Sequence, residues 1–439
     1  MSSLLKYVVV MLSTCLVAML MVGAVVGRGA SPEDAYRHLA VYTEVLSRIK
    51  SDYVEEPDMK SVTLGAVNGL LESIDPYASF LSAEQYKSYL KAKDSQKGGV
   101  GLILAKRYGY IGIVDAIPGS PADKAGLSTQ DMIETIKGIS TRDMPLAYAE
   151  VLLNGDPGTA IELTVLRLRR GTEAQKVTLT RAVVKPPPVA ARMAAEGIGQ
   201  IEVSSLEPGT VKEVAQAIAA LQTKGAKKLI LDLRHSASGA PQEGVALANL
   251  FIEKGLITYL QGQKVSRQNF EAEPAKTIYR DPLAVIVNRG TADGAEVAAA
   301  ALLDSKRAVA VIGERTYGDA ALRKAITMDD GSAVILSVAK YYSPSGKAIQ
   351  DTAVTPSVAV LDQEPAADID EDAPDKPEAI EPPRKPENDA ALQKAIEVLT
   401  KGLPPVEERK AQNQNQDRDP VRRPGDILTP VIPPKVPRR

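Results

Sequence analysis

Hydrophobic positions at the start of the chain form one unbroken run. Residues 7–27 are uncharged and mostly apolar, with Lys6 before them and Arg28 after them. A run of ~20 such residues is long enough to cross a bilayer. We therefore expect residues 1–28 to be a transmembrane anchor that leaves the rest of the chain exported. A cleaved signal peptide is the alternative, because small residues follow the apolar core.

Residues 31–95 change to a helical pattern. Apolar residues recur there at spacings of three and four, which predicts two or three helices. Prolines at 57 and 76 should break them, because proline cannot continue a helix. We expect this segment to pack on the larger domain as a structural element. The positions that define its first apolar face are Leu39, Tyr42, Val45, Leu46 and Ile49.

Residues 96–183 predict a β-rich module with one or two short helices. A glycine-rich loop precedes its first strand, and successive inward N–H groups in such a loop can hold a carboxylate. A peptide C-terminus, added as an extra strand, is the natural ligand. The expected peptide-binding residues are Gly98, Gly99, Val100, Gly101 and Leu102.

Residues 189–362 alternate between short apolar runs and amphipathic runs, which predicts an α/β core. In the helix 210–224, Thr210 and Glu213 suggest a capping box, and Gly225 a helix end. The predicted strands are 197–204, 227–234, 283–288 and 307–313, and the other predicted helices are 244–251 and 295–304.

The C-terminal part contains little that can fold. Residues 363–389 are acidic and proline-rich, which predicts a disordered linker. Residues 390–400 carry apolar positions on one helical face and predict a short helix. Residues 401–439 are rich in proline, arginine, asparagine and glutamine, and we expect a disordered tail.

Composition removes several classes of function. Lysine plus arginine (53) nearly balance aspartate plus glutamate (55), so no charge field favours nucleic acid. Cys15 is the single cysteine and His38 and His235 are the two histidines, which excludes a disulfide framework and zinc sites rich in cysteine or histidine. Neither histidine lies in a stretch that looks like a base-bearing loop. We expect no cofactor and no metal.

The stretch Asn288–Glu296 joins a predicted buried strand directly to a predicted helix. Turns of this kind often carry the nucleophile of α/β enzymes, lifted above the sheet toward the unpaired amides of the helix. The residue at the centre of this turn is Asp293.

Four motifs resemble the carboxyl-terminal processing (tail-specific) protease family, in the same order and at similar spacing. They are Leu-Asp-Leu-Arg234, Asn-Arg-Gly-Thr-Ala-x-x-x-Glu296, Gly-Glu-Arg-Thr-Tyr-Gly318 and Lys-Tyr-Tyr-Ser-Pro-Ser-Gly-Lys-Ala-Ile-Gln350. The stretch Gly119–Leu127 similarly resembles a PDZ domain. The resemblance covers roughly residues 35–400. It implies an exported serine peptidase with a Ser-Lys dyad, a crotonase-like ββα core and a PDZ domain that captures substrate C-termini.

The residues of the dyad do not carry over. The nucleophilic serine of the family corresponds to Asp293, and the general-base lysine to Asp319. The glutamine that orients this lysine corresponds to Arg323. The glycine pair of the oxyanion loop is reduced to Ser238-Gly239.

Asp293, Asp319 and Arg323 are therefore expected to form a mutually compensated charge cluster, with Arg323 one helical turn from Asp319. Three interpretations remain open: a salt-bridged relic without chemistry; an active peptidase using Ser238 or Thr291 with Lys324; or paired carboxylates that share a proton or hold a divalent cation. A Ser-Lys pair works because a neutral lysine accepts the hydroxyl proton, and two aspartates supply neither group.

The sequence therefore predicts an exported, catalytically inactive homologue that binds the C-terminal tails of envelope proteins. It would act as an adaptor, or as a regulator in a homo-oligomer or a hetero-oligomer with an active paralogue. The alternative is an active serine-type endopeptidase that cleaves envelope proteins near their C-termini.

Overall fold

The structure is a computed structural model that describes residues 32–94, 98–107, 109–129, 131–142, 144–167, 174–361 and 389–403. The chain divides into two compact units, Met1–Ala66 and Val67–Arg439. The predicted anchor, the predicted linker apart from Asp389, and nearly all of the predicted tail lie outside the described residues. Among the described helices, none has the length and apolar content needed to span a membrane.

The first unit contains helix α2 (Pro32–Asp52) and the beginning of α3 (Met59–Ile74), as the helical spacing predicted. The chain leaves helical geometry around Pro57 and again after α3, just before Pro76. The apolar face of α2 is largely exposed within its unit, and Leu39 and Val45 are more than half accessible.

The second unit begins with the end of α3, followed by β1 (Ser79–Leu81) and α4 (Ala83–Asp94). Next comes an antiparallel sheet in the order β2-β3-β4-β6-β7, with β5 paired to β4. The elements of this module are β2 (Leu102–Arg107), β3 (Tyr110–Ala116), α5 (Pro121–Lys124), β4 (Met132–Ile136), β5 (Ile139–Ser140), α6 (Leu146–Leu153), β6 (Ala160–Leu166) and β7 (Ala174–Thr180). The predicted β-rich module is confirmed.

The α/β core is a six-stranded sheet in the order β17-β14-β13-β10-β9-β8, parallel except for β8. Its strands are β8 (Ala190–Ala195), β9 (Ile198–Glu202), β10 (Lys228–Asp232), β13 (Leu283–Val287), β14 (Ala310–Gly313) and β17 (Val358–Ala359). Its helices are α7 (Thr210–Thr223), α8 (Pro241–Asn249), α9 (Gly294–Asp304) and α11 (Ala390–Lys401).

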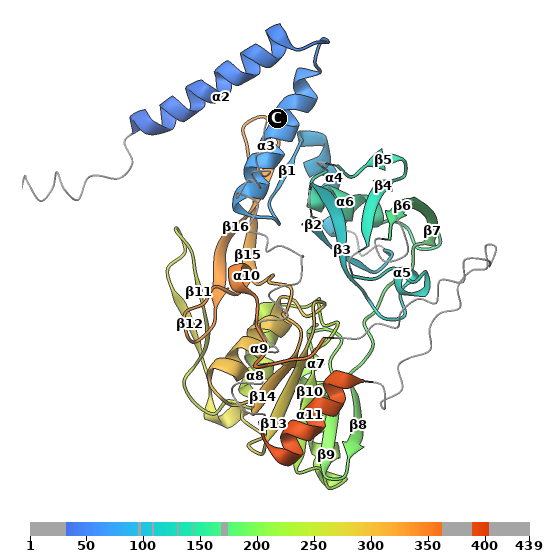
Figure 1. The fold of residues 1–439 in the computed structure, drawn as a ribbon, viewed down its shortest axis with the longest axis vertical. Helices are drawn as coiled ribbons and strands as arrows, with labels where there is room; N and C mark the ends of the chain where they lie inside the picture. The colour runs from blue at the N-terminus through green and yellow to red at the C-terminus, as the bar shows by residue number, and fades with distance from the viewer. Residues whose placement is uncertain are drawn as a thin grey trace, which may run out of the picture. The chain divides into compact units, whose positions relative to one another are not determined.

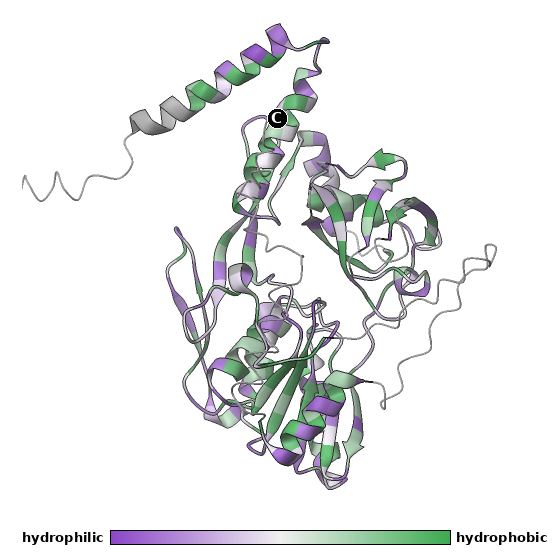
Figure 2. Ribbon diagram, in the orientation of Figure 1, coloured by the Kyte–Doolittle hydropathy of each residue, from purple (hydrophilic) through white to green (hydrophobic). Residues whose placement is uncertain are grey.

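Helices cover both faces of this sheet (Figure 1). Odd-numbered residues such as Leu229, Leu231 and Val285 pack in the cluster that contains α7, α8 and α9. Even-numbered residues such as Ile230 and Ile286 pack in the cluster that contains α11. Both faces are buried, which explains why these strands are continuous apolar runs (Figure 2).

A five-stranded sheet completes the second unit, in the order β1-β16-β11-β12 with β15 paired to β16. Its remaining elements, with two short helices of the same region, are β11 (Leu256–Gln261), β12 (Gln268–Glu271), η1 (Pro274–Lys276), β15 (Ala321–Thr327), β16 (Ala333–Tyr342) and α10 (Ile349–Thr352). Residue 323 belongs to β15 of this sheet. In the sequence, β15 follows the parallel strand β14.

One local prediction in the core is wrong. The capping box at Thr210 does not form, because Gly209 is the N-cap residue with φ 103° and Glu213 accepts from the backbone N–H of Val189. Gly225 does end the helix with φ 91°. The predicted C-terminal helix is confirmed as α11, whose N-cap Asp389 accepts from the N–H of Leu392 at 2.9 Å.

Candidate functional site: a catalytic turn with substituted side chains

Asp293 occupies a strained backbone position at the start of α9. Its φ of 50° and ψ of −119° lie outside the regions that a non-glycine residue prefers. The side chain makes no capping hydrogen bond to the helix amides, and Oδ1 is buried without a partner among the described residues. The Asp293 carboxyl group thus does not bind the helix amides, which a nucleophile at this turn is expected to face.

Thr291 and Asn288 hold the turn that contains Asp293. The Thr291 hydroxyl donates to the carbonyl of Leu233 at 2.8 Å and accepts from the N–H of Asn288 at 3.0 Å. The Asn288 side-chain oxygen accepts from the N–H groups of His235 and Gly290. Thr291 is fully buried and both hydrogen-bonding directions of its hydroxyl are used. Its role is to fix the turn, and it is not placed as a nucleophile.

Glu296 brings position 319 to the turn. This fully buried carboxylate on α9 accepts from the Gly318 N–H at 2.6 Å, from the Asp319 N–H at 2.7 Å, and from the Thr316 hydroxyl. The N–H of Tyr317 donates to the carbonyl of Thr291 at 3.0 Å. In the sequence, Glu296 stands out only as the last residue of a motif. In the structure it is the positioning residue between the two dyad positions.

Asp319 and Arg323 form the predicted ion pair. The helical turn that was expected to place them is wrong, because Arg323 lies on β15 and Asp319 just before that strand. The Arg323 guanidinium also lies over the ring of Tyr77, 4.3 Å from the ring centroid. The Tyr77 hydroxyl donates to the carbonyl of Gly318 at 3.1 Å, so the residue before Asp319 is held from both sides.

The charge cluster is compensated unequally. Arg323 pairs with Asp319, whereas no cation among the described residues is hydrogen-bonded to Asp293. Burial, followed by the negative charge of Asp319, raises the pKa of Asp293 to about 8. At neutral pH this carboxyl group is mainly protonated. Asp293 is thus favoured in its neutral form, although the charge of Arg323 opposes this shift without a hydrogen bond.

The predicted oxyanion loop, at Ser238 and Gly239, is held by backbone hydrogen bonds. The carbonyl of Ser238 accepts from the N–H of Leu206 at 2.8 Å. Gly239 has φ 121°, and a Cβ there would lie 2.2 Å from the Leu206 carbonyl oxygen. Only glycine fits at 239. The N–H of Ala292 donates to the carbonyl of Ser236 at 3.0 Å, which ties this loop to the turn.

His235, which sequence analysis did not consider functional, joins the oxyanion loop to the β-rich module. Its Nδ1 lies 2.9 Å from a carboxylate oxygen of Asp115 on β3, and its Nε2 lies 3.1 Å from the amide nitrogen of Asn288. The carboxylate of Asp115 outweighs burial and raises the pKa of His235. No sequence pattern relates residues 115 and 235, because their contact exists only between separate domains.

The predicted peptide-binding loop is partly tied to its own module. Gly99 exchanges backbone hydrogen bonds with Ala182 at 2.8 and 2.9 Å, so its amide is not available to a ligand. Gly101 has φ 81°, and a Cβ there would lie 2.2 Å from the Cβ of Ser120. Strand β2 ends the described order of its sheet, next to α6, which leaves an edge where a peptide strand could pair.

The geometry disfavours Thr291 and Lys324 as a nucleophile and base pair. Lys324 is an exposed residue of β15, whereas the Thr291 hydroxyl is buried and fully hydrogen-bonded. Within the described residues, no three histidine, cysteine, aspartate or glutamate side chains are arranged as a metal site.

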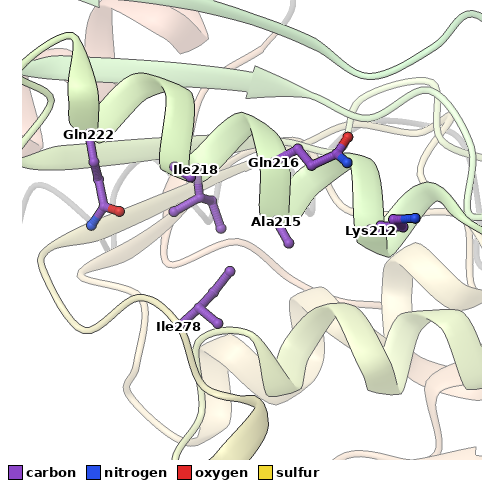
Figure 3. Close-up of a pocket in the computed structure, with 7 residues that line it drawn as sticks. Lys212, Ala215, Gln216, Ile218, Gln222 and Ile278 are labelled. Atoms are coloured by element: carbon purple, nitrogen blue, oxygen red, sulfur yellow. The ribbon is translucent and has the colours of Figure 1, made fainter.

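A separate groove runs along α7 (Figure 3). It has a volume of about 430 Å³, and Ile278 faces α7 across it. None of the residues that line this groove belongs to the dyad positions or to the oxyanion loop. The lining residues are Lys212, Ala215, Gln216, Ile218, Ala219, Gln222 and Ile278.

Comparison with known families matches both folded domains. Residues 197–360 match the model of peptidase family S41, and residues 112–167 match the PDZ domain model. The described architecture is therefore a mixed α/β fold that combines a PDZ domain with an S41 peptidase core.

Individual relatives extend this similarity across both domains. The chain is 36% identical over 313 residues to the carboxy-terminal processing protease CtpA of Bacillus subtilis, covering 71% of this chain and 66% of that protein. It is 32% identical over 321 residues to the carboxyl-terminal-processing protease of Synechocystis sp., covering 71% and 74%. The solved photosystem II D1 C-terminal processing protease has a TM-score of 0.60 at 25% identity, covering 73% of this chain and 92% of that structure.

Proposed function

This chain belongs to the carboxyl-terminal processing protease family, and we propose that it binds the C-terminal tails of proteins without cleaving them by Ser-Lys chemistry. The observation that carries the proposal is the ion pair between Asp319 and Arg323 beside the buried side chain of Asp293, whose pKa is raised. Neither dyad position offers a hydroxyl nucleophile or an amine base, so the proton transfer that activates a serine has no donor and no acceptor.

Binding needs less from the side chains than cleavage does. Strand β2 at the edge of the PDZ sheet and the backbone of residues 100–102 are the elements that would pair with a peptide strand and its carboxylate. They depend on the backbone of the PDZ domain, and positions 293, 319 and 323 lie outside that domain. The ligand class that follows is a protein with an unstructured, apolar C-terminus.

Peptide binding is tested with matched free and amidated peptides that have apolar C-termini, using fluorescence anisotropy with the full chain. Loss of the terminal carboxylate should weaken binding by about tenfold or more, because a charge-assisted hydrogen bond is worth roughly 1.5–3 kcal/mol. Equal affinity for the two peptides would refute the PDZ role.

Two glycine variants locate that binding. Gly101→Ala should weaken it, because the new Cβ would collide with Ser120. Gly119→Ala is the matched control: Gly119 has a similar φ of 79° but open space around its Cβ position. Binding that is lost equally in both variants would point to strain of the domain and not to the loop.

An active endopeptidase is the second candidate. The names of the relatives support it more directly than they support loss of activity, and the contrary argument rests on the side chains at three positions. The test is incubation of the full chain with unstructured proteins, compared with Asp293→Ala. Cleavage that persists through purification and disappears in the variant would overturn the inactive assignment.

The setting of this function remains a proposal as well. Residues 7–27 support a membrane anchor that exports the remaining chain to the periplasm. An adaptor held at that membrane could present protein tails to an active paralogue. Cell fractionation with a C-terminal tag tests the location: recovery of the full-length chain in the cytosol would exclude it.

A further inference from the structure

The dipeptide Asp293-Gly294 has a backbone geometry suited to a reaction within the chain itself. The ψ angle of Asp293 is −119°. Around the Cα–C bond, the Cβ of an L-residue lies one third of a turn from its backbone nitrogen, so this ψ nearly eclipses Cβ with the nitrogen of Gly294. Atoms Cγ, Cβ, Cα, C and that nitrogen are the members of a five-membered imide ring. Rotation about Cα–Cβ alone would close the ring.

Gly294 supplies the other requirements. It has no Cβ to obstruct approach to its nitrogen, and as the first residue of α9 its N–H belongs to the amides that a helix start leaves without an intrahelical partner. The positive φ of Asp293 stores strain in the same peptide unit. A turn that presents a serine for catalysis therefore holds an Asp-Gly sequence in a conformation that most Asp-Gly sequences adopt only transiently.

We propose that Asp293-Gly294 is a site of spontaneous modification in the native protein, forming a succinimide and then isoaspartate. The Gly294 nitrogen attacks Cγ of Asp293; the N–Cγ bond forms, the Cγ–OH bond breaks, and the hydroxyl leaves with the amide proton as one water molecule. Water then opens the ring at Cγ to restore aspartate, or at the main-chain carbonyl to give isoaspartate. No oxidant, reductant or other co-reactant is needed.

The surroundings of Asp293 favour the first step. A neutral carboxyl group loses hydroxyl as water far more readily than a carboxylate does. Burial and the negative charges of Asp319 and Glu296 together raise the pKa of Asp293 to about 8, against the opposing charge of Arg323. Burial, followed by the negative charge of Asp293, raises the pKa of the nearby Tyr341 hydroxyl. The reactive protonated form is thus present at neutral pH.

The chain contains its own control. Asp330-Gly331 is the second Asp-Gly sequence. Its carboxylate accepts from the N–H of Ser332 at 2.9 Å and from the Ser332 hydroxyl, and these bonds lower its pKa. Asp330 is therefore ionised at neutral pH and held by Ser332, so the native structure should protect it.

The experiment ages the full chain at neutral pH in native buffer and in urea, followed by tryptic digestion in mild acid and mass spectrometry. The peptides Gly290–Lys306 and Ala325–Lys340 separate the two sites. Succinimide is read as loss of one water and by hydroxylamine cleavage, and isoaspartate by fragmentation and by labelling with isoaspartyl methyltransferase. Asp293→Ser should remove both products from the first peptide.

We expect modification at Asp293 to be about tenfold faster in the native chain than in urea, because folding has already fixed a backbone rotation worth roughly 1–2 kcal/mol. At Asp330 the native chain should be the slower of the two. A rate at Asp293 that is equal to or below its rate in urea would overturn the proposal, as would equal native rates at the two sites. The result is independent of whether the protein cleaves peptides.

Discussion

Two regions of the molecule depend on backbone geometry: the predicted peptide-binding loop of the PDZ domain and the turn at Asn288–Gly294. They differ in the side chains that their functions require. The loop relies on glycine geometry and a free strand edge, both of which are present at Gly101 and β2. The turn needs a hydroxyl group and an amine in addition, and its centre is an aspartate. Binding can therefore persist where this chemistry is absent.

The frame around the turn shows why the fold tolerates the exchange. Thr291, Asn288 and Glu296 hold the two dyad positions together through hydrogen bonds to the backbone. None of these bonds involves the side chain of residue 293 or 319. The hydrogen bonds of the frame therefore do not depend on which side chains occupy positions 293 and 319.

Restoring the Ser-Lys dyad should have the largest effect, because it would give the turn the side chains that cleavage requires. The variant Asp293→Ser/Asp319→Lys/Arg323→Gln should gain cleavage of unstructured proteins by about 100-fold or more over the parent, because a positioned general base is worth 10²–10⁴ in rate. Release of new N-termini measures it.

The matched control for this gain is Asp293→Ala/Asp319→Lys/Arg323→Gln, which carries the lysine without a hydroxyl. It should stay at the parental level. If the parent protein already cleaves as fast as the restored variant, the substitutions at the turn do not abolish catalysis, and the proposed difference between a binding loop and an inactive turn is wrong.

Arg323→Met tests how far the ion pair supports the fold. Asp319 would lose its counter-charge, and only 23% of its side chain is exposed to solvent. We expect a loss of about 2 kcal/mol in the free energy of unfolding, below the 3–5 kcal/mol typical of fully buried pairs. Urea unfolding measures it.

Lys324→Met is the control, because Lys324 is exposed on the same strand. Its effect should stay within about 0.5 kcal/mol. Similar losses in both variants would mean that the ion pair contributes nothing specific.

The pH dependence of stability reports the charge state of Asp293. Its folded pKa, about 8, lies above the unfolded value of about 3.9, so the native state binds more protons between these values. Stability should therefore fall as the pH rises, by at most about 1.4 kcal/mol per unit from this group. Asp293→Ser should flatten the profile over that window; an unchanged profile would assign the dependence to other acids such as Glu296.

The smallest expected effect concerns the contact between the PDZ domain and the oxyanion loop. Asp115 raises the pKa of His235, so this pair stabilises the fold below the unfolded histidine pKa and its contribution is lost as the pH rises through the folded pKa. Asp115→Asn should lower the pKa of His235 in an NMR titration of the imidazole. An unchanged pKa would show that the contact does not form in solution.

The sequence by itself determined the family, the order of domains and the identity of the substituted residues. Short motifs such as Asn288–Glu296 can be recognised in the sequence because they are local. The strands β10 and β13 can be recognised because both of their faces are buried, which makes them continuous apolar runs. The ion pair of Asp319 with Arg323 was also predicted, because both residues were matched to neighbouring family positions, although the element that carries Arg323 was not.

Only the tertiary structure decided how each charge is satisfied. The pKa of Asp293 depends on its burial, on the charge of Asp319 and on the ion pair of Asp319 with Arg323. The residues involved belong to different segments of the chain. The link from His235 to Asp115 crosses 120 positions of chain. The ψ angle of Asp293 follows from the strand–helix turn. Such properties arise from distances and torsion angles that a residue pattern does not specify.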